Sequence, residues 1–197
     1  MLESQNILPY DGEVYYEKCI WDKPNAENLL REMQQHLQWQ HDELMMFGKK
    51  ITTNRKVAWY GDKAFTYTYS RTTKSAIPWH PLLLPIREKT ETVTNASFNA
   101  CLCNFYHHGN EGMTWHSDDD KEFGINPTIA SLSFGAERTF SFRHKITKEV
   151  ISIILESGSV LLMKSNTQTH WVHALPKSAK IKDPRINLTF RWVVEEC

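Results

Sequence analysis

The sequence of 197 residues is long enough for one domain with a sizeable hydrophobic core and too short for two. Apolar residues make up 41% of it and aromatic residues 12%, which is typical of a packed globular protein. No apolar run is long enough to cross a membrane, and the first residues lack the basic and then apolar order of a signal peptide. The sequence therefore predicts neither a membrane span nor export.

The net charge is zero, yet the charges are unevenly distributed along the chain. Residues 1–47 carry nine acidic and three basic side chains, whereas residues 48–75 carry seven basic and one acidic side chain. A neutral total can therefore hide a positive surface that meets phosphate groups. The alternative, a basic loop that is merely solvated, remains open on charge alone.

The four cysteines show neither metal-ligand nor disulfide spacing. Cys101 and Cys103 lie two residues apart in a strand-like run, so we expect them to face the same way as buried, reduced thiols. Reduced thiols indicate an intracellular compartment. The first forty residues carry no basic address or partner-binding motif, which favours a bacterial cytoplasm over the alternative, a eukaryotic nucleus. We expect a monomer.

The N-terminal part of the sequence predicts helices on either side of an extended segment. Apolar side chains repeat at helical spacing along residues 25–38, after the helix-start signals Asp22 and Pro24. A second helix is predicted after Pro81. Between them, residues 51–72 are rich in Thr, Tyr, Trp and Val, which indicates strands or an extended lid.

From about residue 97 the sequence becomes a series of short β-prone runs separated by Gly, Pro, Asn and Asp. Many short strands at even spacing predict an antiparallel sandwich or barrel, with a double-sheeted jelly roll as the leading candidate. The predicted strands lie in residues 98–106, 128–135, 138–144, 150–155, 158–163, 169–175 and 185–194.

Candidate metal ligands lie within this β-rich part. His116 and Asp118 are two residues apart, so in an extended strand both side chains project from one face. A later histidine, either His170 or His173, completes two imidazoles and a carboxylate, the facial triad that leaves open positions on non-haem iron(II). The spacing alone does not decide between the two histidines.

The last predicted strand offers a site for a carboxylate. Alternation places Arg185, Asn187, Thr189 and Arg191 on one face and apolar side chains on the other. Arginines in such a pattern normally face solvent. Here they follow the distal histidines closely, where a planar guanidinium could grip a dicarboxylate co-substrate bidentately.

The runs NFYHHGNEGMTWHSDDD, SLSFGAERTFSFRH, GSVLLM, THWVHALP and PRINLTFR, in this order, resemble the AlkB family of Fe(II)- and 2-oxoglutarate-dependent nucleic-acid dioxygenases. The resemblance extends from about Phe47 to Trp192. The stretches MFGK, RKVAWYGD, FTYTYS and PWHPLL further resemble the branch that repairs double-stranded DNA. The first forty or so residues show little resemblance to the family.

The resemblance implies a single domain over residues 1–197. Its fold would be mainly β with flanking helices: a double-stranded β-helix (jelly-roll) core in residues 97–197, preceded by helices and a nucleotide-recognition lid in residues 1–96. Fe(II) is the implied metal, and 2-oxoglutarate and O2 are the implied co-substrates. The implied iron ligands are His116, Asp118 and His173, because the family pattern of an aromatic residue, any residue and His selects His173. The residues implied to bind 2-oxoglutarate are Asn104, Tyr106, Arg185, Asn187 and Arg191.

The resemblance also implies contacts to DNA. Phe47, beside Gly48 and Lys49, would be a wedge that enters the duplex, although core packing of Phe47 is the alternative. Arg55 and Lys56 would contact the backbone or the opposite strand. The residues implied to meet the damaged base are Tyr67, Tyr69, Ser70, His116 and Asp120, the last of which stands where the branch usually has Glu.

The implied activity is oxidative demethylation of alkylated DNA, double- or single-stranded, at lesions such as N1-methyladenine and N3-methylcytosine. Decarboxylation of 2-oxoglutarate would be coupled to hydroxylation of the methyl group, and the unstable product would release formaldehyde. Three alternatives are an RNA demethylase, which needs no wedge, a hydroxylase of proteins or small molecules, and a damage-recognition protein without activity.

Overall fold

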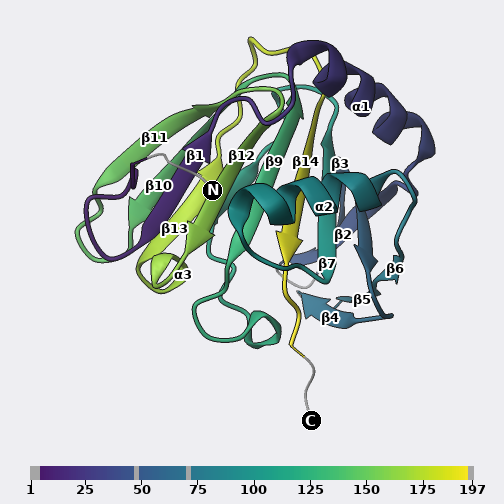
Figure 1. Ribbon diagram of the computed structural model, residues 1–197. Coiled ribbons are helices and arrows are strands. Elements are labelled where there is room, and N and C mark those ends of the chain that lie inside the picture. The colour runs from purple at the N-terminus through teal and green to yellow at the C-terminus, as the bar shows by residue number, and fades with distance from the viewer. Residues whose placement is uncertain (1–4, 47–48, 70–71, 195–197) are drawn as a thin grey trace.

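The computed structural model describes residues 5–46, 49–69 and 72–194, and two stacked β-sheets dominate it (Figure 1). The main sheet consists, in spatial order, of β1 (Glu13–Glu17), β12 (Ser159–Lys164), β9 (Ile129–Gly135), β14 (Arg185–Arg191), β7 (Ala100–Tyr106), β3 (Lys49–Gly61) and β2 (Gln40–Met46), with β6 (Ile77–Pro78) paired to β3. The minor sheet consists of β11 (Val150–Leu155), β10 (Arg138–His144), β13 (Trp171–Leu175) and β8 (Met113–His116). A hairpin of β4 (Thr66–Tyr69) and β5 (Thr72–Ser75) forms a third sheet of its own.

Two helices cover one face of the main sheet (Figure 1). Helix α1 (Lys23–His36) begins where the Asp22 side chain accepts a hydrogen bond from the Asn25 amide at 2.9 Å, and it buries Ala26 and Met33. Helix α2 (Leu83–Thr94) buries Leu83, Ile86, Thr90 and Thr94. Both helices were predicted from the sequence, and each begins within two residues of its predicted start.

The hydrophobic core has two parts, one on each face of the main sheet. One part packs the helices against side chains such as Ile186, Leu188 and Phe190 of β14. The other fills the space between the two sheets and includes Phe142 and Trp171. Alternation along each strand sends neighbouring side chains into opposite parts of the core. Antiparallel pairing throughout both large sheets, apart from the β3–β6 contact, gives the predicted jelly roll.

The structure differs from the sequence prediction at two points. Strands β1, β2 and β3 belong to the main sheet, so the residues before 97 build part of the sandwich in addition to helices and a lid. The predicted strand 169–175 is divided into a short helix α3 (Thr167–His170) and β13. A one-turn 3-10 helix, η1 (Lys121–Phe123), also follows β8. Within the described residues, no helix is both long and apolar enough to span a membrane.

Candidate active site

A pocket of about 260 Å³ opens between the two sheets. The inward face of β14 supplies its polar wall, because the alternate residues of that strand point to the helices. The minor sheet supplies the opposite wall through Met113, His116, Phe140 and His173. The polar residues of β14 that line the pocket are Arg185, Asn187, Thr189 and Arg191.

One group of possible metal ligands lies in this pocket. His116 of β8 and His173 of β13 are cross-strand partners, and their rings are 4.3 Å apart between centroids. Asp118 follows β8 by two residues. One ligand atom from each of the three side chains lies within 4.8 Å of the others. The antiparallel register of β8 and β13 therefore brings together residues that are 57 positions apart in the sequence.

The hydrogen bond of His116 leaves one ring nitrogen available for a metal. Its Nδ1 lies 2.7 Å from the backbone carbonyl oxygen of Thr114. A carbonyl only accepts, so Nδ1 carries the proton and Nε2 keeps its lone pair in the neutral ring. Orientation of a ligand imidazole by a backbone carbonyl is the usual arrangement at metal sites.

Burial and charge favour the protonation states that a metal needs. Desolvation lowers the pKa of His173 to about 3, with a further contribution from His116, so the imidazole is neutral at physiological pH. Burial alone would raise the pKa of Asp118, but the positive charge of Arg191 and the nearby histidines lower it to about 2. Arg191 Nη2 also donates to Asp118 Oδ2 at 2.7 Å. A neutral imidazole and an ionised carboxylate thus face the same point.

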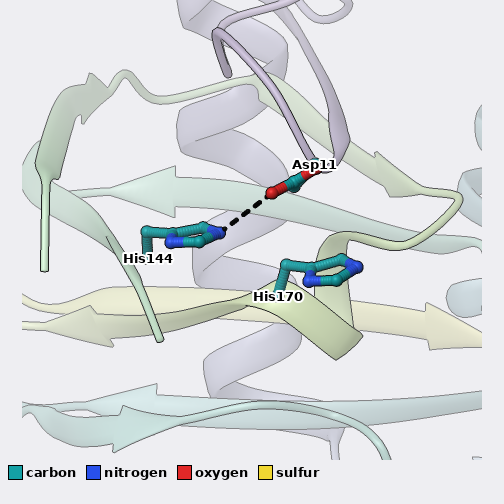
Figure 2. Close-up of side chains that lie close together, drawn as sticks. All are labelled: Asp11, His144 and His170. Carbon is teal, nitrogen blue, oxygen red and sulfur yellow. Dashed lines mark ion pairs between the residues drawn. The ribbon is translucent and has the colours of Figure 1, made fainter. Parts of the chain in front are cut away.

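In a second group of possible ligands, Asp11, His144 and His170 lie close together (Figure 2), and none of the three lines the pocket. The backbone N–H of Thr147 donates to His144 Nδ1 at 3.1 Å, so the proton of the neutral ring is on Nε2. That Nε2 faces Asp11 Oδ2 at 3.3 Å (Figure 2). A protonated Nε2 has no lone pair for a metal, so the ring nitrogen of His144 that faces this group is not available as a ligand. The geometry therefore favours His173 over His170 as the metal ligand.

The guanidinium of Arg185 is buried without an acidic partner among the described residues. Its side chain is 2% exposed, its Nη2 donates to Ser133 Oγ at 2.9 Å, and its Nε has no hydrogen-bond partner. Burial and the neighbouring Arg138 lower its pKa to about 10, which still leaves it charged. A buried cation is costly unless an anion neutralises it, so this end of the pocket is suited to a carboxylate.

The remaining residues expected to bind 2-oxoglutarate also line the pocket, but several of their hydrogen bonds are already made. Asn187 donates to Ser131 Oγ and to the Leu132 carbonyl, both at 2.8 Å. Asn104 Oδ1 accepts from Arg55 Nη1 at 2.6 Å. Tyr106 is 4% exposed and lies beside Arg185.

Arg55 does not lie on a DNA-facing loop as the sequence analysis expected. It belongs to β3, its side chain is 7% exposed, and its Nη2 forms an ion pair with Asp42. Alternation along β3 turns Arg55 into the pocket rather than onto an exposed surface, and its expected contact with DNA stays a prediction. Lys56, the next residue, points the other way and is half-buried.

The other residues expected to contact nucleic acid are only partly described. Asp120 lines the pocket. Tyr67 and Tyr69 lie on β4, and Lys49 on β3, but only their backbone is described. Phe47, Gly48 and Ser70 fall outside the described residues. Their expected roles stay predictions.

Among the pocket residues that the sequence analysis did not name, three make specific contacts. Asp42 is the buried partner of Arg55, and no pattern in its strand marks it as inward-facing. Trp115 lies at the rim with Arg143 Cζ 4.3 Å from its ring centroid. Phe123 contacts Arg191 from η1, at 4.8 Å between Cζ and the ring centroid. A tryptophan directly before a candidate ligand was the one available signal.

The arrangement of two histidines, a carboxylate and a buried arginine defines a class of protein, and comparison with known proteins agrees with it. The profile of the 2OG-Fe(II) oxygenase superfamily matches residues 12–191, so the chain belongs to this superfamily. Its cofactors are accordingly Fe(II) and 2-oxoglutarate, with O2.

Relatives place the chain more narrowly. It is 38% identical over 186 residues to the protein named DNA oxidative demethylase ALKBH2 of Bos taurus, covering 89% of this chain and 67% of that protein. It is equally identical to ALKBH2 of Homo sapiens, covering 89% and 71% of the two chains. It is also 38% identical to alpha-ketoglutarate-dependent dioxygenase alkB homolog 3 of Homo sapiens, covering 87% and 63%. The resemblance to the AlkB family and its DNA-repair branch is thereby confirmed.

A solved structure supports the fold. The structure of OsALKBH1 superposes with a TM-score of 0.63 and 15% identity, covering 91% of this chain and 96% of that one. At this identity the likeness concerns the fold alone. The jelly-roll prediction is confirmed by it and by the strand pairing described above.

The residues of the pocket fit both cofactors. Two neutral imidazoles and one carboxylate are the donor set that non-haem iron(II) uses. The orphaned Nε atoms of Arg185 and Arg191 are buried donors that lack acceptors among the described residues. A dicarboxylate bound between them would supply acceptors.

Proposed function

We propose that this protein is a DNA repair enzyme that oxidatively removes methyl groups from alkylated bases. The observation that carries the proposal is the joint presence, in one pocket, of a His116–Asp118–His173 cluster and a buried Arg185 without an acidic partner. The names of relatives that are 38% identical to this chain support DNA as the substrate. The compartment we infer is the one that holds the DNA, a bacterial cytoplasm or a nucleus, and we infer a monomer.

Each group of residues has a separate task in this proposal. His116, Asp118 and His173 would hold Fe(II), which when bound with 2-oxoglutarate and O2 supplies the oxidising power for hydroxylation. Arg185 would pair with the distal carboxylate of 2-oxoglutarate, and Tyr106 would pack beside that pair. The walls of the pocket exclude water, which lets charged groups act more strongly on one another.

Arg191 has two tasks. It donates to Asp118 at 2.7 Å, which keeps that carboxylate ionised and fixes its orientation. Its unpartnered Nε faces a buried environment, which suits an oxygen atom of the co-substrate near the metal end of the pocket. Because one guanidinium would serve both, metal and co-substrate positions would be linked mechanically.

The substrate we infer is a base with a methyl group on a nitrogen of its pairing edge. Such a nitrogen is inaccessible in a duplex, so the base must leave the stack, and a lesion that cannot pair lowers that cost. Methylation at N1 of adenine or N3 of cytosine leaves a cation at neutral pH. Asp120, which lines the pocket, would attract that charge.

The experiment is single-turnover formaldehyde release from four matched oligonucleotides that carry 1-methyladenine, 3-methylcytosine, 3-methylthymine or 1-methylguanine, each single- and double-stranded. We expect turnover of the two cationic lesions to be faster, and Asp120→Asn to reduce that difference. Release from none of the DNA substrates contradicts the proposal. Equal rates for all four lesions contradict the part assigned to Asp120 and leave demethylation standing.

A further inference from the structure

The hairpin β4–β5 begins at the metal end of the pocket. Strand β3 ends at Gly61, which pairs with Ala100 of β7, and Ala100 in turn pairs with Arg191 of β14. Arg191 holds Asp118, so the root of the hairpin lies at the same end of the sheet as the candidate metal ligands. The hairpin pairs with neither large sheet. An isolated two-stranded hairpin is marginally stable in water. Apart from contacts of β5 with β2, the orientation of this hairpin therefore depends on how its two ends are held.

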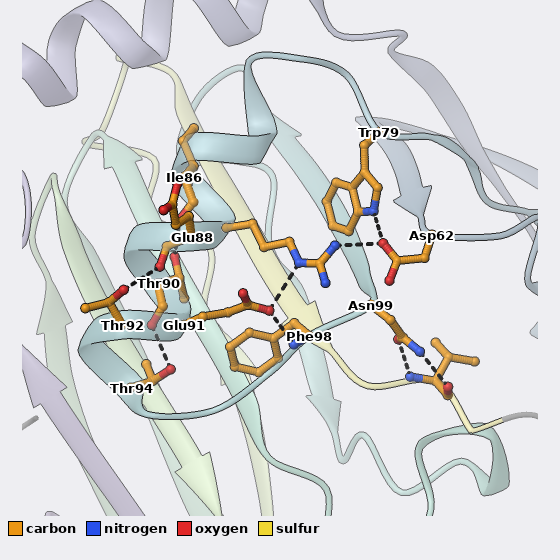
Figure 3. Close-up of polar contacts among 12 residues, drawn as sticks. Asp62, Trp79, Ile86, Glu88, Thr90, Glu91, Thr92, Thr94, Phe98 and Asn99 are labelled. Carbon is orange, nitrogen blue, oxygen red and sulfur yellow. Dashed lines mark hydrogen bonds and ion pairs between the residues drawn. The ribbon is translucent and has the colours of Figure 1, made fainter.

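The pairing of β3 with β6 joins those two ends through the backbone, and one carboxylate adds side-chain contacts beside it. Asp62 follows β3, before the hairpin, and Trp79 follows β6, after it. Asp62 Oδ1 accepts a hydrogen bond from Trp79 Nε1 at 2.6 Å and another from Arg87 Nη1 of α2 at 2.7 Å (Figure 3). The Asp62 amide also donates to the Asn99 carbonyl at 2.9 Å. Asp62 therefore reinforces the closure made by β3 and β6 and attaches the segment that carries the hairpin to helix α2.

The two partners of Asp62 are themselves fixed. Arg87 Nε donates to Glu91 Oε1 at 3.1 Å, and the same oxygen accepts from the Phe98 amide at 2.8 Å (Figure 3). Arg87 Cζ lies 5.1 Å from the Trp79 ring centroid, a cation–π distance. The indole stacks on Phe190 of β14 with an interplanar angle of 15°. The contacts of Asp62 thus extend through Trp79 to the strand that ends in Arg191.

These contacts are poorly placed to stabilise the fold as a whole. The Asp62 and Arg87 side chains are 42% and 21% exposed, and ion pairs at such exposure contribute little to folding stability. Their geometry, in contrast, is specific: two donors from different elements converge on one oxygen atom. A role in holding an orientation suits this arrangement better than a role in global stability.

We propose that Asp62, Trp79 and Arg87 form a clasp that, with the pairing of β3 and β6, sets the orientation of the β4–β5 hairpin, whose root lies at the metal end of the pocket. The three side chains contact neither the candidate metal ligands nor Arg185, so they are positioning residues. Strand β4 carries Tyr67 and Tyr69, which are expected to meet the damaged base. An effect of the clasp on base recognition therefore rests on the proposed function, whereas the clasp as a structural feature is independent of it.

The first test is hydrogen exchange of the full-length protein. In Asp62→Ala we expect the amides of β4 and β5 to exchange about tenfold faster, with β7 and β14 unchanged, because local opening is independent of global unfolding. Trp79→Phe retains an aromatic ring at the Phe190 contact but lacks the N–H donor, so it should show a smaller increase. Lys18→Ala is the control, since it removes a more exposed ion pair, to Glu156, that involves neither the hairpin nor α2.

Two results of this test would overturn the clasp. One is unchanged exchange of the hairpin in both Asp62→Ala and Trp79→Phe. The other is an equal rise in β7, β14 and the hairpin, because that would show general destabilisation. An equally large increase in hairpin exchange in Lys18→Ala would also show that the effect of Asp62→Ala is not specific.

The second test separates the clasp from the proposed function. For Asp62→Ala we expect KM for methylated DNA to rise about tenfold, while the affinity for 2-oxoglutarate and the metal content stay at the wild-type level. A loss of 2-oxoglutarate affinity as large as the rise in KM would contradict a positioning role. If the wild-type protein demethylates no DNA, the proposed function fails, and the exchange measurement still decides whether the clasp holds the hairpin.

Discussion

At the scale of single residues, the hydrogen bond at one nitrogen of a neutral imidazole determines whether the other nitrogen has a lone pair for a metal. In His116 a carbonyl binds Nδ1 and leaves Nε2 free for a metal, whereas in His144 a backbone N–H binds Nδ1 and places the proton on Nε2. Both histidines lie beside a carboxylate and a second histidine. The residue types alone therefore do not distinguish the two clusters. The backbone group that contacts Nδ1 of each ring distinguishes them.

This distinction predicts which histidine variants lose metal. His173→Ala should lose nearly all bound Fe(II) and all turnover, because a two-ligand site no longer holds the facial arrangement. His170→Ala should retain the metal content of the wild type, because His144 presents a protonated Nε2 to that cluster and a protonated nitrogen cannot bind a metal. Metal content after anaerobic reconstitution is the measurement. Loss of metal in His170→Ala, with retention in His173→Ala, would reverse the assignment.

The buried Arg185 leads to a second prediction at this scale. Arg185→Lys should weaken 2-oxoglutarate binding by roughly 10- to 150-fold, because the point charge of Lys cannot replace a bidentate fork and a charge-assisted hydrogen bond contributes about 1.5–3 kcal/mol. Anaerobic titration of the metal-loaded protein with 2-oxoglutarate measures it, and DNA affinity should change little. The exposed Arg31→Lys on α1 is the control. An unchanged affinity in Arg185→Lys would place the co-substrate elsewhere.

At the scale of elements, the turn that ends β9 shapes the arginine end of the pocket. Gly135 pairs with Arg185 and has a φ of +89°, and a Cβ at this position would lie 2.4 Å from the Pro184 carbonyl oxygen. Any other residue would therefore meet backbone strain and a clash with backbone that cannot move aside cheaply.

We accordingly expect Gly135→Ala to lower the free energy of unfolding by at least about 2 kcal/mol, since positive φ alone costs roughly 1–3 kcal/mol. Gly124→Ala is a matched control, because Gly124 has a φ of +72° but its added Cβ would meet only Val194 at 3.6 Å. Urea denaturation of both variants measures the difference. Equal losses would show that the contact with Pro184 relaxes freely.

The segment between β2 and β3 carries the next prediction. Phe47→Ala should reduce activity on double-stranded DNA far more than on single-stranded DNA, because a wedge helps only where stacked bases must be separated, at a cost of about a few kcal/mol. Kinetics on one lesion in both contexts measures this. Leu84→Ala, at an exposed apolar position on α2, serves as control. Equal losses on both substrates would indicate that Phe47 is a packing residue.

At the scale of the whole molecule, the cofactors should act as a structural link between the two sheets. The candidate metal ligands come from β8 and β13 and the segment after β8, while the arginines come from β14 of the main sheet. A ligand that binds only the folded state at about 100 times its dissociation constant stabilises that state by about 2.7 kcal/mol. We therefore expect bound metal and 2-oxoglutarate to stabilise both sheets against unfolding.

Metal with 2-oxoglutarate should therefore raise Tm by roughly 5–10 °C, because 1 kcal/mol corresponds to about 2–4 °C in a protein of this size. Mn(II) in place of Fe(II) avoids turnover during a thermal scan. His173→Ala should show a markedly smaller rise. A rise of wild-type size in that variant would show that the stabilisation arises away from this pocket.

The sequence by itself determined most of the elements and the family. Strand runs such as 138–144 and 150–155 coincide with β10 and β11, because alternating side chains and turn residues are local properties. Cys101 and Cys103 are buried on one face as expected, with their sulfur atoms 3.9 Å apart. Motif order alone was sufficient for the AlkB resemblance.

Only the tertiary structure decided which residues share the pocket and which charges are neutralised. The pairing of β13 with β8 brings His173 to His116, and the same chain places His170 beside Asp11. Arg55 looked like part of a basic surface, yet β3 turns it inward to Asp42. The physical reason is that register and strand facing depend on contacts between distant segments, which a linear pattern of residues does not contain.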